Sequence, residues 1–190
     1  GILVFIPLFV ISLWAYHREG HPLVCEPFRR RFRLTRLSRP HWHWLFGGIV
    51  AVVAVTGLLM ITLPSVIPAF VPSPPFLHLD PITPDRWWIL AAWLPFFFFN
   101  IVGEEFLWRG YILPRQEAAF GRRAWMLHAA GWMVFHLPFG VNLILLLSPI
   151  LLIEPYVVSR QKNTWIGIGI HGVVNGTGFL ALALGWIPAS

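Results

Sequence analysis

Two adjacent glutamates and an arginine, Glu104, Glu105 and Arg109, directly follow one of the most apolar runs of the sequence. Charged side chains inside a membrane segment are rare and cost about 2.5–3.5 kcal/mol each on insertion scales, so function is the default hypothesis for them. On a helix, Glu105 and Arg109 lie four residues apart with the acid first, which is the orientation that favours pairing. We therefore expect them to form a structural ion pair. Glu104 is turned away by about 100°, and we expect its carboxylate to line a polar cavity.

Three further polar residues lie in later apolar segments: His136 in one, and His171 with Asn175 in another. His171 and Asn175 are four residues apart and share one helix face. Structural alternatives exist for all of them. His136 and the nearby His128 can be core histidines that donate to backbone carbonyls, and a histidine–asparagine pair can join two helices. The occurrence of Glu104, His136 and His171 on three separate segments favours a shared polar cavity.

The composition is that of a membrane protein. Of the 190 residues, 57% are hydrophobic and 12% are charged, whereas soluble domains carry about 25% charged residues. The formal net charge of +6 resides between apolar runs, which favours a topological role over nucleic-acid binding. Cys25 is the only cysteine, which excludes an intrachain disulfide and a cysteine metal cluster.

We expect an all-α, polytopic integral membrane bundle of about six transmembrane segments, because helices satisfy their own backbone groups in lipid. The apolar segments are residues 1–16, 42–70, 87–114, 124–138, 141–156 and 164–186. Residues 1–16 have no basic region before them and no small-residue cleavage site after them, so we expect a transmembrane helix with a trimmed start rather than a signal peptide. Glu154 lies at the end of its segment, where we expect a solvated carboxylate.

The loops predict the orientation. Residues 17–41 hold seven arginines, residues 109–123 hold four, and residues 159–163 hold Arg160 and Lys162. We expect these three connections to be cytoplasmic and the N-terminus to lie outside. The sequence divides into an N-terminal part, 1–86, with the basic loop and a proline-rich outer loop, and a catalytic helical core, 87–190.

These motifs resemble those of the CPBP family, glutamate-dependent intramembrane proteases that include the CAAX prenyl endopeptidases and bacterial relatives. The family pattern is E-E-x-x-x-R, then F-x-x-x-H, then H-x-x-x-N. This chain has "EEFLWR" at Glu104–Arg109, "WMVFH" at Trp132–His136 and "HGVVN" at His171–Asn175. One departure is Trp132, where the family has phenylalanine. We expect the bulkier indole to reshape the substrate pocket.

The resemblance implies peptide hydrolysis without a cofactor. Glu104 would act as the general base on a water molecule, and His136 would help to hold the water and shuttle the proton. His171 and Asn175 would donate to the developing oxyanion, a contribution of about 2.7–4 kcal/mol per donor. An alternative is a Zn²⁺ site with Glu104, His136 and His171 as ligands and one open position. We favour the metal-free form, because the sequence has no H-E-x-x-H motif and Asn175 is a poor zinc ligand.

The implied activity is cleavage near the C-terminus of a membrane-anchored protein or peptide in a lipid bilayer. The small size and the arginine-rich loop favour a multi-pass protein of the bacterial inner (plasma) membrane. The alternatives are a non-catalytic membrane scaffold or immunity protein and a proton-coupled transporter that uses the same polar residues as a relay. Transporters of that kind are often built from inverted repeats, and the sequence has no internal symmetry.

Overall fold

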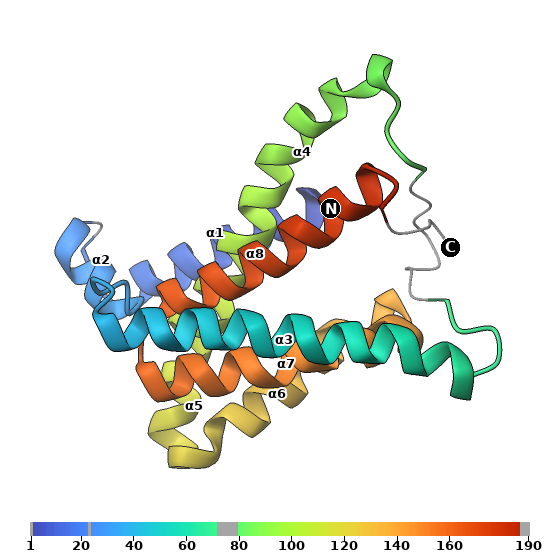
Figure 1. Cartoon of the computed structure of the whole chain (residues 1–190). Helices are drawn as coiled ribbons and strands as arrows, with labels where there is room; N and C mark the ends of the chain where they lie inside the picture. Colours follow the sequence, from blue (N-terminus) through green and yellow to red (C-terminus); the bar gives the residue numbers. More distant parts are fainter. Residues whose placement is uncertain (1, 23, 72–79, 187–190) are drawn as a thin grey trace.

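The computed structural model describes residues 2–22, 24–71 and 80–186. Every regular element in these residues is helical, which confirms the all-α fold class (Figure 1). The α-helices are α1 (Ile2–Arg18), α2 (Cys25–Arg31), α3 (Arg39–Val66), α4 (Trp88–Phe98), α5 (Leu113–Phe120), α6 (Ala124–Phe135), α7 (Val141–Gln161) and α8 (Thr164–Ala183). The shorter turns are η1 (Pro84–Arg86), η2 (Phe99–Gly103), η3 (Phe106–Ile112), η4 (Gly121–Arg123) and η5 (Leu137–Phe139), of which η2 and η3 are π-helical.

Four helical stretches in the described part of the chain are long and apolar enough to span a membrane: Arg39–Val66, Trp88–Phe135, Val141–Gln161 and Thr164–Ala183. The expected number of about six is not confirmed. Helix α1 is apolar but shorter, and the third and fourth predicted segments form one run of helical residues. That run turns back at Gly121, whose φ of 60° lies in the region that favours glycine. Helices α5 and α6 therefore pack against each other.

Helices α3, α7 and α8 pack against one another, and α6 packs against α7 (Figure 1). Glycines permit the close approach of α3 and α8. A Cβ on Gly48 would lie 2.6 Å from Ile170, and a Cβ on Gly169 would lie 2.6 Å from Leu45. Small residues at helix interfaces are the usual means of close packing in lipid, where no hydrophobic force drives helices together.

Helix α1 covers the other side of the site and packs against η2 and η3. A Cβ on Gly103 would lie 2.7 Å from the Phe5 carbonyl oxygen, so the residue before Glu104 touches the backbone of α1. Nearby, Tyr16, Phe32 and Phe106 form a buried aromatic cluster. The two glutamates are thus held between α1 and the α3–α7–α8 group.

The three arginine-bearing connections meet at one end of the bundle, which we call the basic end (residues 17–39, 113–123 and 159–164). Glu117 joins them, with its carboxylate 2.8 Å from Arg33 Nη1 and 2.7 Å from Lys162 Nζ. The backbone N–H of Thr164 donates to the Arg33 carbonyl at 3.0 Å. These contacts agree with the predicted location of all three connections on one side of the membrane.

The proline-rich loop meets the far end of α8, because the Ile82 N–H donates to the Ala183 carbonyl at 2.7 Å. Residues 72–79, most of this loop, lie outside the described residues. The division of the chain at residue 86 stays a prediction; across it, α3 packs on both α7 and α8.

Candidate active site

The glutamate pair lies between two π-helical turns. Turn η2 ends at Gly103 and η3 begins at Phe106, so Glu104 and Glu105 form the α-helical link between them. π-Helical turns inside α-helices occur frequently at functional sites. Here the two turns flank the only adjacent pair of acids in the chain.

Glu104 is 2% exposed, and both of its carboxylate oxygens accept hydrogen bonds. Asn100 Nδ2 donates to Oε1 at 3.0 Å, and the indole N–H of Trp132 donates to Oε2 at 2.8 Å. Sequence reasoning missed Asn100. The signal was present, because Asn100 precedes Glu104 by four residues and therefore shares its helix face.

Trp132 is the centre of the site. Its ring is 1% exposed, and the guanidinium carbon of Arg109 lies 3.4 Å from the ring centre. The imidazoles of His136 and His171 approach it edge-on, with centroids 5.4 and 5.5 Å away. The ring is packed among polar side chains, and its predicted role in a substrate pocket stays a prediction.

His136 is half-buried at the end of α6. Its Nδ1 lies 2.8 Å from the Trp132 carbonyl oxygen. A carbonyl can only accept, so Nδ1 carries the proton. In the neutral ring, Nε2 is then the acceptor.

His171 and Asn175 share one face of α8, as expected from their spacing. The Glu105 carboxylate accepts from His171 Nδ1 at 3.0 Å. Asn175 Nδ2 lies 2.9 Å from His171 Nε2 and 3.4 Å from Asn100 Oδ1. A chain of hydrogen bonds thus runs from Glu105 through His171 and Asn175 to Asn100, which holds Glu104.

Arg109 contacts two carboxylates. Its Nη1 lies 3.2 Å from Glu105 Oε1, as the spacing predicts, and its Nη2 lies 2.7 Å from Glu154 Oε1. All three side chains are fully buried. The expectation of a solvated Glu154 is therefore wrong. This glutamate lies two turns before the end of α7 and faces the bundle, where Arg109 is its counter-charge.

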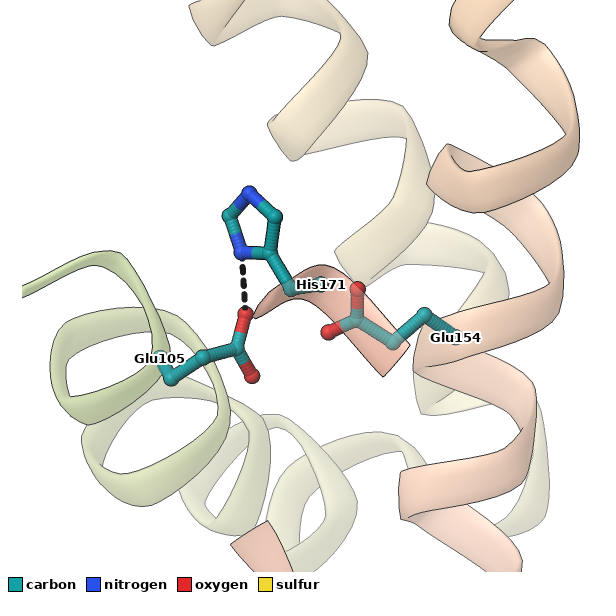
Figure 2. A group of neighbouring side chains, drawn as sticks. All are labelled: Glu105, Glu154 and His171. Atoms are coloured by element: carbon teal, nitrogen blue, oxygen red, sulfur yellow. Dashed lines mark hydrogen bonds and ion pairs between the residues drawn. The ribbon is translucent and has the colours of Figure 1, made fainter. Parts of the chain in front are cut away.

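Gly167 makes room for this pair of acids. A Cβ on Gly167 would collide with Glu105 Oε2 and lie 3.1 Å from Glu154 Oε1. Figure 2 shows the two carboxylates near each other, with His171 bonded to Glu105. A glycine at this point of α8 lets the backbone of α8 approach both acids.

One group of three acidic or histidine side chains in the described residues has ligand atoms within 4.8 Å of one another: Glu105, Glu154 and His171. Arg109 already pairs with both carboxylates of that group, and a cation beside a guanidinium is electrostatically unfavourable. The alternative zinc set named above, with Glu104 and His136 in place of the two acids, does not form such a group among the described residues. Hydrolysis without a metal stays a prediction, with zinc as its alternative.

Residues 86–177 match the family model described as type II CAAX prenyl endopeptidase Rce1-like. The match contains all three sequence motifs and ends two residues after Asn175. No curated protein and no solved structure matches the chain. The match confirms the resemblance to the CAAX proteases, and with the apolar helices it identifies a multi-pass integral membrane protein.

Proposed function

Because residues 86–177 match the Rce1-like model of type II CAAX prenyl endopeptidases, we propose that the chain hydrolyses a peptide bond near the C-terminus of a membrane-anchored, prenylated protein or peptide. The single observation that carries the proposal is the buried carboxylate of Glu104, held by two N–H donors beside two histidines. The bilayer holds both enzyme and substrate. We propose the bacterial inner membrane as its location.

Glu104 is suited to act as the general base. Its oxygens each accept one hydrogen bond from the protein, and a carboxylate has about four acceptor sites, so capacity remains for a water molecule. His136 offers the Nε2 lone pair as a second acceptor for that water. In the proposed reaction, Glu104 takes a proton from the water molecule while the water oxygen attacks the carbonyl carbon of the substrate. The proton then passes to the leaving amine.

The contacts of His171 support its role beside the oxyanion. Its Nδ1–H donates to the buried Glu105 carboxylate at 3.0 Å, and its Nε2 lies 2.9 Å from Asn175 Nδ2. Donation by Nε2 to the oxyanion requires the doubly protonated ring, in which Nδ1–H still donates to Glu105. Asn175 would turn its NH₂ group from Nε2 to the same oxygen.

The test measures release of the C-terminal peptide from a farnesylated CAAX reporter in proteoliposomes. We expect Glu104→Gln, His136→Ala and His171→Ala each to lower the rate by at least about 100-fold, the usual scale for lost acid–base or oxyanion groups. His128→Gln is the matched control. His128 is also buried, and its Nδ1 contacts Gln116 at 2.7 Å, outside the proposed machinery. Cleavage by all three variants at the wild-type rate would overturn the protease proposal in favour of a scaffold or transporter.

A second arm addresses substrate and metal. Membranes from cells with and without the gene are compared by mass spectrometry, and we expect a membrane-anchored protein to retain extra C-terminal residues when the gene is absent.

We also expect the rate of reporter cleavage to be unchanged by incubation with 1,10-phenanthroline. Loss of activity with the chelator, followed by recovery with Zn²⁺, would instead establish the zinc alternative.

A further inference from the structure

A groove opens toward the lipid between α3 and α7, near the basic end and apart from the glutamate site. Its volume is about 410 Å³. The residues that line it include His43, Trp44, Gly47, Ala51, Tyr156 and Val157. Residues 43–51 extend about 12 Å along α3 at 1.5 Å per residue. The groove thus runs from the polar end of the helix into the depth of the hydrocarbon layer.

Gly47 lines the groove where α3 has no side chain to fill it. A Cβ on Gly47 meets no atom within 4 Å, whereas a Cβ on the neighbouring Gly48 would lie 2.6 Å from Ile170. Gly47 therefore faces the open side of α3, and Gly48 faces α8. The walls include two aromatic side chains, Trp44 and Tyr156, whose ring centres are 6.4 Å apart. Tryptophan and tyrosine are enriched at the level of lipid headgroups.

The mouth of the groove is basic. His43 and Arg39 are exposed on the first turns of α3, and the exposed Arg160 lies over the ring of Tyr156 at 5.2 Å. Neither arginine pairs with a carboxylate among the described residues. The basic end as a whole carries twelve arginine and lysine residues against three glutamates.

Those three glutamates are already neutralised by protein cations: Glu19 by Arg31, Glu26 by Arg30, and Glu117 by Arg33 and Lys162. The excess positive charge at the mouth therefore has no protein counter-charge among the described residues. We propose that the groove binds an anionic phospholipid, with one acyl chain against Gly47 and Ala51 and the phosphate between His43 and Arg160. The basic mouth of the groove favours an acidic headgroup, and the apolar groove below the mouth accommodates a hydrocarbon tail.

Native mass spectrometry of the full-length chain tests the proposal, with dioleoyl-phosphatidylglycerol and dioleoyl-phosphatidylcholine as probes that differ only in headgroup. We expect the wild-type protein to retain one phosphatidylglycerol molecule per chain, and to retain phosphatidylcholine at least about tenfold less. We expect Gly47→Leu to retain at least about tenfold less phosphatidylglycerol than wild type, because the leucine fills the groove. Gly57→Leu is the matched control, since Gly57 lies on the same helix and a Cβ there also meets nothing within 4 Å.

Two surface variants test the headgroup contact without touching the helix packing. We expect the double variant His43→Gln, Arg160→Gln to lose the preference for phosphatidylglycerol, and Arg122→Gln, another exposed cation of the basic end, to keep it. Equal retention of the lipid by Gly47→Leu and Gly57→Leu, or equal binding of the two headgroups by wild type, overturns the proposal. Displacement of the lipid by farnesyl-cysteine methyl ester at equal concentration would also overturn it, because the groove would then hold an isoprenoid.

Discussion

Trp132 adds to the site a hydrogen bond that the phenylalanine of the family pattern lacks. Its indole N–H donates to Glu104, and its ring lies against Arg109, so it contacts the first and the last residue of the E-E-x-x-x-R motif. Together with Asn100, Trp132 thus holds both carboxylate oxygens of the proposed base. In this chain, the residue first expected to shape the substrate pocket also orients the carboxylate.

We predict that Trp132→Phe lowers kcat for the reporter by about 10- to 100-fold, since a hydrogen bond to a charged group contributes about 1.5–3 kcal/mol. The KM should change little, because the ring that remains still packs in the site. Steady-state kinetics in proteoliposomes measures both constants. An unchanged kcat would show that the indole N–H does not position Glu104.

Trp108→Phe serves as the matched control. Trp108 Nε1 is buried without a hydrogen-bond partner among the described residues, so Trp108→Phe removes an indole N–H that donates to no carboxylate and should leave kcat unchanged.

At this scale, local spacing predicted one contact within a helical run, did not lead to Asn100 in the same run, and gave no sign of a contact with another helix. The Glu105–Arg109 contact follows from a separation of four residues. The shorter contact of Arg109, to Glu154 at 2.7 Å, joins residues 45 positions apart, and no periodicity in the sequence reports it. A carboxylate near a helix end has the same sequence signature whether it faces water or the bundle.

At the scale of elements, Gly167 on α8 determines how closely that helix approaches the buried acids. We predict that Gly167→Ala lowers the melting temperature in detergent and reduces reporter cleavage, because the new methyl group collides with Glu105. Overpacking of this kind typically costs about 1–3 kcal/mol. Wild-type stability and activity in Gly167→Ala would contradict the close approach of α8 to Glu105.

Gly178→Ala on the same helix is the control. A Cβ there meets nothing within 4 Å, and alanine is the better helix former by up to about 1 kcal/mol. We therefore expect Gly178→Ala to keep full activity and to be at least as stable as wild type.

The π-helical turns could not be predicted, because no residue of η2 or η3 distinguishes a π-helical turn from an α-helical one in the sequence. An α-helical turn of about 100° per residue gives the faces of Glu104 and Glu105 only approximately, because π-helical turns lie on both sides of the pair. The apolar segments were easier to predict, since transfer into lipid depends on composition. Their count was harder, because α5 and α6 are joined by the three-residue turn η4 with no break in helical character.

At the scale of the whole molecule, the basic end fixes which connections share a side of the membrane, and the single cysteine gives a direct test of which side that is. Cys25 is exposed in this end. We predict that a membrane-impermeant maleimide labels Cys25 in inside-out vesicles and not in intact spheroplasts, because arginine-rich connections stay in the cytoplasm.

The control places a thiol at the opposite end of the bundle. Asp85→Cys in a Cys25→Ser background, at an exposed position of η1, should show the reverse pattern of labelling. Labelling of Cys25 from outside would invert the proposed topology and would place the lipid groove in the outer leaflet.

The contacts of Glu117 also bear on how the protein is made. A nascent chain emerges from its N-terminus onward, so Arg33 is synthesised long before Glu117, and Lys162 comes last. Glu105 and Arg109 are likewise synthesised before Glu154 and His171, with which they pair in the folded protein. Until the final helical hairpin is inserted, these charges lack part of their compensation, which makes the unfinished chain a natural substrate for quality-control proteases.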